Sequence, residues 1–186
     1  MNLYFKFILL IIKRLLFKRR QRITETCVSH FRVGFMDMDL NFHMNNGRFF
    51  SVMDLGRFDL LMRTGTFLKL FSNGYYPVVL SESMVFKKSL GYWDAYQVHT
   101  CLESWDKDFF YITQKFYRKD QIVASGNIRG CFKKRGKKGI VKIKDLFEFI
   151  GEPHSDVELT AIASKQIELD NVLLPREKKA RTEVRT

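Results

Sequence analysis

Residues 46–63 most constrain the fold, because they read as a helix that is apolar around most of its circumference. Asn45 before them is a good N-terminal cap, and Gly65 after them is a common helix stop. At 1.5 Å per residue, the helix is about 27 Å long. The apolar residues are Phe49, Phe50, Val52, Met53, Leu55, Phe58, Leu60, Leu61 and Met62. Such a helix has to be wrapped by other structure rather than lie on a surface.

The polar residues of this helix divide into two groups. Arg48, Asp59 and Arg63 mark a single polar edge, which we expect to face solvent. Asp54 falls on the opposite side among apolar residues, where burial of a carboxylate is costly unless it is paired or has a function.

Strands flank the helix on both sides in sequence. One strand is expected from Ser29, before the helix, and four more over residues 76–87, 95–105, 109–118 and 121–133. This order predicts an α+β fold, in which an antiparallel β-sheet wraps around one long central helix. A short strand or turn near residues 140–143 and a helical segment near residues 157–169 complete the expected elements.

Length and charge set the domain organisation. With 186 residues, the chain can bury one ordinary core. Seven basic residues lie within residues 1–22 and eight within residues 129–144, with no acid in either segment, so the net charge of +12 belongs to two patches. We expect a basic amphipathic arm over residues 1–24, one domain over residues 25–150, and a short helix with a charged, disordered tail over residues 151–186.

The amino-terminal arm has too short an apolar run to cross a bilayer readily. Its longest uncharged run has six residues, whereas a span needs about 20, and no small-residue cleavage site follows it. On a helix, one narrow face gathers four cations, Lys6, Lys13, Arg14 and Arg20. We expect residues 1–22 to lie on an anionic membrane surface with their cations toward the headgroups. A short signal-anchor that spans the bilayer and an arm packed on its own domain are the alternatives.

The cysteines and the basic patches exclude several classes of protein. Cys27, Cys101 and Cys131 are odd in number, far apart and without C-x-x-C spacing, so neither a disulfide framework nor a zinc site is indicated. A reducing, cytoplasmic location with peripheral membrane association is expected, without a metal or a separate cofactor. Neither basic patch interleaves with aromatic residues in a nucleic-acid-binding frame, so nucleic acid is not an expected partner.

Residues 37–49 concentrate the chemistry of the chain immediately before the long helix. They follow the pattern D-x-D-x-x-x-H-x-N-N-G-x-F. This pattern, with the helix and strands after it, resembles the hotdog-fold acyl-CoA thioesterases of the 4-hydroxybenzoyl-CoA thioesterase type. The wording of residues 39–50 and of residues 104–111 (S-W-D-K-D-F-F-Y) is most similar to the branch that includes the membrane-associated thioesterase-superfamily-member proteins of animals. The resemblance implies the hotdog fold.

The resemblance also implies roles for the motif residues. Asp39 matches the acidic position that acts as general base or nucleophile toward the acyl carbon. The free backbone N–H of Asn46 or Gly47, at the helix N-terminus, polarises the thioester carbonyl. Other branches carry their carboxylate about two turns into the helix, at the position of Asp54, which makes it a rival or helper of Asp39. The structural alternative for Asp54 is an ion pair with Arg57.

The other candidates have plain structural alternatives too. Asp39 can instead accept backbone N–H groups in a turn. His43 can orient the attacking water, hydrogen-bond the thioester or bridge backbone groups. Asn45 and Asn46 can contact the substrate or merely cap the helix.

Members of this family pair as dimers, so the resemblance implies a homodimer or a dimer of dimers. Ser81, Glu82 and Ser83, on the strand after the helix, are the expected cross-subunit residues that bind substrate. The turn at residues 106–108 carries two acids where some relatives hold CoA phosphates with basic residues. The basic segment 133–138 can take over that role, join the arm on lipid, or form a solvated hairpin.

Together these features predict hydrolysis of acyl-CoA or acyl-carrier thioesters to free acid and thiol at a membrane surface, with CoA present only as part of the substrate. A non-catalytic hotdog module that binds acyl chains or lipids is the first alternative. A hydroxyacyl-thioester hydratase or dehydratase is the second. Those enzymes resemble D-x-N-P-x-H, whereas no proline lies between Asp39 and His43 and their spacing is one residue shorter, so the second alternative is discounted.

Overall fold

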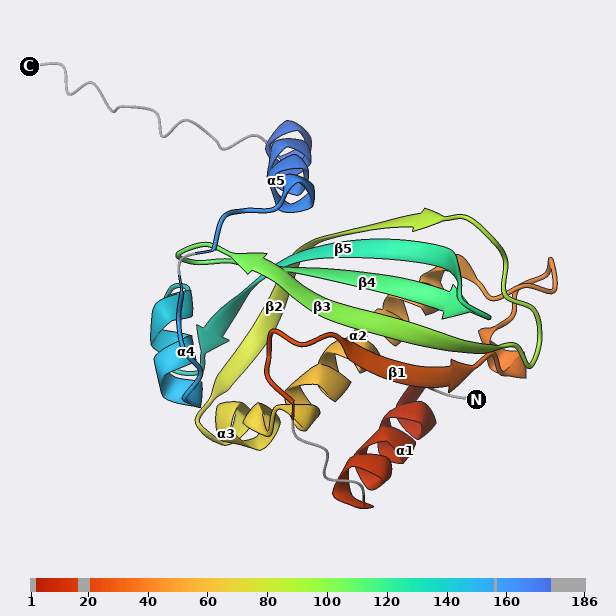
Figure 1. The fold of residues 1–186 in the computed structure, drawn as a ribbon, viewed down its shortest axis with the longest axis horizontal. Helices are drawn as coiled ribbons and strands as arrows, with labels where there is room; N and C mark the ends of the chain where they lie inside the picture. Colours follow the sequence, from red (N-terminus) through yellow and green to blue (C-terminus); the bar gives the residue numbers. More distant parts are fainter. Residues whose placement is uncertain (1–2, 17–20, 156, 175–186) are drawn as a thin grey trace, which may run out of the picture.

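A five-stranded antiparallel sheet curls around one long helix in a computed structural model that describes residues 3–16, 21–155 and 157–174 (Figure 1). The strands are β1 (Cys27–Arg32), β2 (Tyr75–Phe86), β3 (Ala95–Trp105), β4 (Phe110–Arg118) and β5 (Gln121–Lys134), in the order β1-β3-β4-β5-β2. All neighbouring strands pair antiparallel. The predicted α+β arrangement is confirmed.

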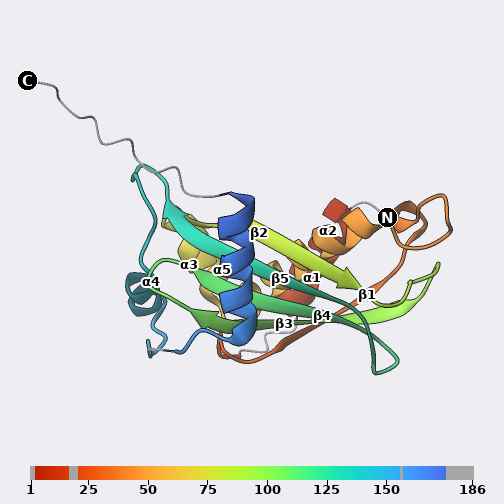
Figure 2. The ribbon, with the colours of Figure 1, turned by 90° about the horizontal axis from the view of Figure 1, so that it is seen from above.

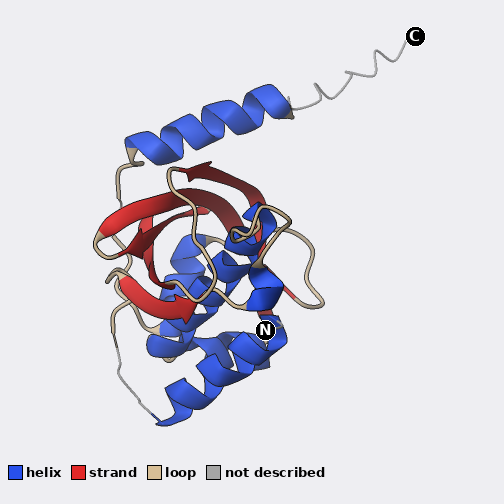
Figure 3. Ribbon diagram, turned by 90° about the vertical axis from the view of Figure 1, so that its right-hand side faces the viewer, coloured by secondary structure: helices blue, strands red, loops and turns tan. Residues whose placement is uncertain are grey.

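Helices lie on both faces of this sheet. α5 (Ala161–Leu173) crosses the outer face (Figure 2). α2 (Asn46–Arg63) lies in the concave face, and α1 (Leu3–Leu16) packs on the side of α2 that is turned away from the sheet (Figure 3). α3 (Thr66–Ser72) and α4 (Ile143–Ile150) lie at the end of the sheet where β2 begins, and a short 3-10 helix (Phe35–Asp37) precedes α2.

Most element boundaries agree with the prediction from sequence. The central helix spans residues 46–63 as predicted, and the four strands predicted after it begin and end within one residue of the observed ones. The strand predicted from Ser29 begins at Cys27 and ends at Arg32. The expected short strand or turn near residues 140–143 is wrong in part, because α4 begins at Ile143 and only Val141 forms an isolated bridge, with Phe132. The expected disordered tail, residues 175–186, lies outside the described residues, as do residues 17–20 of the arm.

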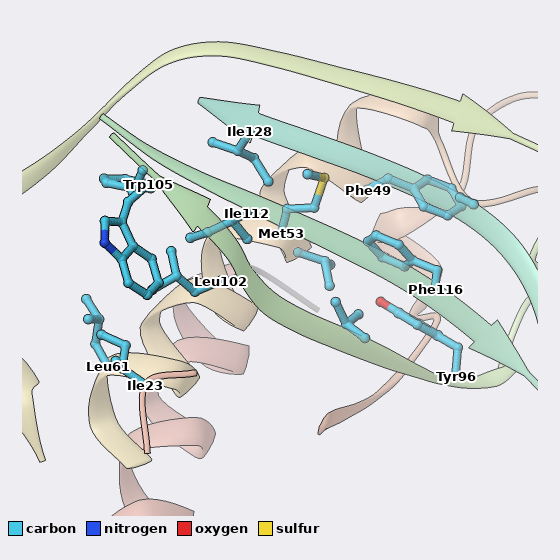
Figure 4. Close-up of a cluster of buried hydrophobic side chains, with 14 of the residues drawn as sticks. Ile23, Phe49, Met53, Leu61, Tyr96, Leu102, Trp105, Ile112, Phe116 and Ile128 are labelled. Carbon is cyan, nitrogen blue, oxygen red and sulfur yellow. The ribbon is translucent and has the colours of Figure 1, made fainter. Parts of the chain in front are cut away.

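Helix α2 approaches the sheet most closely at Gly56. A Cβ atom there would lie 2.6 Å from Nε2 of Gln114 and 2.8 Å from Oγ1 of Thr100. The fully buried Gln114 side chain donates to the carbonyl of Met53 (3.0 Å) and to Thr100 (2.8 Å), so it joins the helix to the sheet. Around this contact, apolar side chains from the helix and the strands fill the core (Figure 4).

Asp59 of α2 is fully buried, so the predicted polar edge of this helix is wrong. α1 covers that side, and the Asp59 carboxylate accepts hydrogen bonds from Arg14 of α1 (2.8 Å), Ser29 (2.6 Å) and Arg63 (3.2 Å). Burial alone would raise the pKa of Asp59, but these donors and charges outweigh it and lower the pKa below its ordinary value. Asp54, expected on the apolar side, is the exposed one: 54% of its side chain is accessible.

Lys6 and Arg14 of α1 point toward the domain, so the expected orientation of these two cations is wrong. Lys6 pairs with the buried Asp37, and Arg14 pairs with Asp59. The described part of the arm, α1, is therefore packed on its own domain. Among the side chains of α1 that the structure describes, the exposed ones are the apolar residues Tyr4, Phe5, Ile8, Leu9 and Ile12. In the part of the chain that the structure describes, no helix is long and apolar enough to span a membrane.

We expect Asp59→Asn to lower the free energy of unfolding by about 3–5 kcal/mol at pH 7, because Arg14 and Arg63 would remain as charges without their carboxylate. Since the pKa of Asp59 is lowered in the folded state, the carboxylate stabilises the fold above its ordinary pKa, near 4, and that stabilisation is lost as the pH falls through the lowered value. Urea unfolding of wild type and variant at pH 7 and pH 3 measures both effects.

The matched control is Glu168→Gln, which breaks the exposed ion pair with Lys165. It should cost less than about 1 kcal/mol. Equal costs for the two variants would contradict the role given to Asp59.

Candidate active site

The loop before α2 folds into a tight hairpin. The N–H of Asp39 donates to the carbonyl of His43 (2.9 Å), and the N–H of Phe42 donates to the carbonyl of Asp39 (3.1 Å). Phe42 has a φ of 57°, in the left-handed region that bulky residues rarely adopt. Buried Asp37 holds the base of the loop through its pair with Lys6 of α1. The motif residues are thus confined to one short turn at the start of the helix.

Asp39 is half-buried in this hairpin and keeps one carboxylate oxygen available. Its Oδ1 accepts the N–H of Asn41 at 2.9 Å, which is the turn-acceptor role considered as its alternative. Its Oδ2 has no hydrogen-bond partner among the described residues. The bond from Asn41 therefore orients the carboxylate without occupying it fully.

The N-terminus of α2 offers one free amide of the two that the resemblance suggested. Oδ1 of Asn45 accepts the N–H of Gly47 at 2.9 Å, so Asn45 caps the helix and the Gly47 amide is occupied. The N–H of Asn46 has no acceptor within the described residues. This amide, at the positive end of the helix dipole, is the one that can bind a carbonyl oxygen.

Three of the predicted catalytic residues, Asp39, His43 and Asn46, line a single open pocket of about 380 Å³. The ring of His43 has no hydrogen-bond partner among the described residues, so it is available to a ligand or a water molecule. Lys87 and Lys88, which follow β2, line the same pocket. Sequence reasoning missed these two lysines, because only the folded sheet brings the end of β2 beside the loop.

Asp54 lies outside this pocket. It is eight residues along α2 from Asn46, about 12 Å at 1.5 Å per residue, and it borders a separate apolar cavity. Its carboxylate pairs with Arg57, as its structural alternative requires, and Arg57 also donates to Glu82 at 2.9 Å. Burial raises the pKa of the Glu82 carboxyl above its usual value, with Arg57 opposing the rise.

Ser81 and Ser83 are not brought to the pocket in this chain. Side chains alternate between the faces of a strand, and both serines lie on the outer face beneath α5. Ser81 donates to Asp170 (2.8 Å) and Ser83 donates to Gln166 (3.0 Å). Of the three residues predicted on this strand, only Glu82 is directed at α2.

Two other segments considered for phosphate binding lie elsewhere. Lys134 donates a hydrogen bond to the hydroxyl of Tyr75 at the start of β2, which is the opposite end of that strand from Lys87. In the acidic turn, Asp106 accepts the N–H of Asp108 at 2.9 Å, so it stabilises the turn itself. Among the residues that the structure describes, the cations that line the loop pocket are therefore the two lysines after β2.

Residues 33–164, which include the loop pocket and α2, match the Thioesterase-like superfamily. The chain belongs to this superfamily. Two solved structures share its fold. A hypothetical protein from Aquifex aeolicus superimposes with a TM-score of 0.61 at 28% identity, covering 66% of this chain and 98% of that one. A 1,4-dihydroxy-2-naphthoyl-CoA thioesterase from Synechocystis gives 0.60 at 11% identity, covering 68% and 95%. The predicted hotdog fold is confirmed.

Curated relatives are similar over part of their length. Protein THEM6 of Xenopus laevis is 34% identical over 90 residues, which cover 48% of this chain and 44% of that protein. A probable thioesterase of Saccharomyces cerevisiae is 28% identical over 119 residues, covering 62% and 50%. The chain thus spans about half the length of these relatives. The superfamily suggested by the motif is confirmed, whereas the 4-hydroxybenzoyl-CoA type stays a prediction.

Proposed function

We propose that this protein hydrolyses acyl-CoA or acyl-carrier thioesters to free acid and thiol at a membrane surface. The observation that carries the proposal is the shared pocket at the start of α2 that Asp39, His43 and Asn46 line, together with the Asn46 amide, which has no acceptor among the described residues. A base or nucleophile beside a hydrogen-bond donor for the developing oxyanion is what acyl transfer requires. The superfamily supports the same reaction class.

The chemistry follows from this geometry in one of two ways. The carbonyl oxygen accepts the N–H of Asn46, which stabilises negative charge as the tetrahedral intermediate forms. As a base, Asp39 takes a proton from water while the water oxygen attacks the carbonyl carbon. The C–S bond then breaks, and the thiolate recovers the proton.

In the second route, Asp39 is the nucleophile. It forms an anhydride with the acyl group and releases the thiolate, and water then cleaves the anhydride. His43 orients the water.

Asp39→Asn should lower kcat by about 10²- to 10⁴-fold, the usual contribution of a positioned acid or base, with little change in KM. Release of free thiol from acyl-CoAs of several chain lengths measures it. Asp54→Asn is the matched control and should stay close to wild type. Full activity of Asp39→Asn together with loss in Asp54→Asn would transfer the catalytic role to Asp54. Binding without turnover in the wild type would favour the acyl-binding module instead.

Lys87 and Lys88 supply the charge that a CoA carrier needs. CoA carries phosphates, and ammonium groups attract them as point charges. The two lysines line the pocket that holds Asp39, so a thioester bound there would extend its carrier toward them. This charge favours CoA over an uncharged carrier.

The double variant Lys87→Ala/Lys88→Ala should raise KM for acyl-CoA by about tenfold. The value of kcat should stay nearly unchanged, because the lysines bind the substrate and the transition state equally well. The same acyl group on N-acetylcysteamine, which has no phosphates, should be hydrolysed equally by variant and wild type. Lys137→Ala/Lys138→Ala, at the far end of the sheet, is the control pair. An equal loss on both thioesters would count against phosphate binding.

The proposal includes a second subunit, which would pair with this one along β2. This strand lies at the edge of the sheet, and four of its apolar residues are exposed, Val79, Leu80, Val85 and Phe86. An exposed apolar edge strand is a template for pairing with another chain. A homodimer joined along β2 would cover these residues and place a second subunit beside each loop pocket.

We also propose that the protein attaches to a membrane through the exposed apolar face of α1. Five apolar side chains of α1 are exposed, while Lys6 and Arg14 face the domain. A contiguous apolar surface of this kind is typical of a binding face. The apolar face would enter the bilayer boundary, and the basic residues that follow α1 in sequence would meet anionic headgroups.

Ile8→Asp/Ile12→Asp should abolish flotation with vesicles that contain anionic lipid, because two charges would enter the apolar face. Ile162→Asp/Leu169→Asp on α5, which also replaces two exposed apolar residues, is the control and should float like wild type. Deleting residues 1–22 is a poorer test, since it also removes the partners of Asp37 and Asp59. Unchanged flotation of the α1 variant would rule out attachment through this face.

A further inference from the structure

The C-terminal half of α2, the concave face of the sheet and α4 enclose an apolar cavity of about 160 Å³. Leu61, Leu102, Trp105 and Ile112 line it from the helix and the strands (Figure 4). Leu146 of α4 lines it as well. The cavity is distinct from the loop pocket, because the two share no lining residue.

The chemistry of the walls selects an apolar occupant. All five of these side chains are buried, and the indole N–H of Trp105 is already bonded to the carbonyl of Ser155 at 3.2 Å. A buried water needs two to four polar partners, whereas an apolar cavity of about 150 Å³ lined by similar residues stays dry and binds benzene. This cavity therefore has room for roughly six carbon atoms and little to hold water.

The cavity has its polar residues at one side, between α2 and β2. Asp54 and Val79 are its exposed lining residues, and Arg57 stands beside them. An irregularity between Val79 and Ser81 changes which residues of β2 face α2. Val79 faces inward before it, and Glu82 and Phe86 face inward after it. Along β2, this row runs from Val79, which lines the cavity, past Glu82 and its ion pair with Arg57, to Phe86, which lines the loop pocket.

We propose that this cavity receives the hydrocarbon end of a long-chain acyl group whose thioester lies at Asn46. The proposal rests on the proposed function for the position of the thioester, but the cavity and its occupant do not require turnover. Asn46 and Asp54 are about 12 Å apart along α2, and an extended chain advances roughly 1.2 Å per bond. About ten carbons cross that distance and about six fill the cavity, so acyl chains near 16 carbons fit both sites. Acyl groups of six carbons held at Asn46 do not reach the cavity.

The fluorescence of Trp105 tests occupancy directly. The chain has two tryptophans, and the other, Trp93, is exposed, so Trp93→Phe leaves Trp105 as the only reporter. In this variant, hexadecanoic acid with bromine at carbon 16 should quench Trp105, because the heavy atom enters the cavity. The same acid with bromine at carbon 2 should quench far less. Equal quenching by the two acids, or quenching by neither, would overturn the proposal.

A cavity-filling variant tests the effect on substrate choice. Leu146→Phe should lower kcat/KM for hexadecanoyl-CoA by at least about tenfold, the loss expected when two methylene groups are displaced from an apolar site. Hexanoyl-CoA should be hydrolysed as by wild type. Leu173→Phe, on the exposed side of α5, is the matched control and should leave both rates unchanged. An equal loss for both substrates would contradict the assignment of the cavity.

The two experiments separate this proposal from the proposed function. Position-dependent quenching without thioester hydrolysis would support the cavity and refute the enzyme. Hydrolysis without position-dependent quenching would support the enzyme and refute the cavity.

Discussion

Helix α2 lies at a fixed depth and register in the sheet because Gly56 has no side chain where it meets Gln114 and Thr100. A shift of the helix by one residue would place a side chain in a space that admits none. The buried Gln114 amide also bonds the carbonyl of Met53, and Arg57 donates to its Oε1 at 3.0 Å. The position of the helix N-terminus, and with it the Asn46 amide, follows from this contact.

The same helix presents two chemically different surroundings along its length. Its start adjoins Asp39 and two lysines in an open, polar pocket, whereas its second half borders an apolar cavity beside Trp105. A thioester with an anionic carrier and a hydrocarbon acyl group has the same order of polar and apolar parts. α1 supports both regions, because Lys6 pairs with Asp37 below the loop and Arg14 pairs with Asp59 near the other end of α2.

Local patterns predicted the elements well, because helix caps and strand alternation depend on neighbouring residues. The Asn45 cap and the limits of α2 are examples.

Sequence patterns failed where an element distant in sequence decides the environment of a residue. Asp59 lies on a polar edge of an isolated helix but is buried once Arg14 of α1 covers it. Ser81 belongs to the predicted strand, yet its partner, Asp170, is on α5, and no local signal joins them. The loop pocket gathers Asp39, His43 and Asn46, which sequence already placed together, whereas Lys87 enters only through the sheet.

The proposed position of the thioester carbonyl, at the N-terminus of α2, is tested most directly by amide nuclear magnetic resonance of the uniformly ¹⁵N-labelled protein. The ligand is a hexadecyl-CoA ketone analogue that keeps the carbonyl and cannot be hydrolysed. We expect the Asn46 amide proton to move downfield on binding, because it becomes a hydrogen-bond donor, while the capped Gly47 amide changes less. Binding that leaves Asn46 unmoved, with shifts confined to residues around Asp54 and Arg57, would contradict this position and place the reacting carbonyl at the middle of the helix.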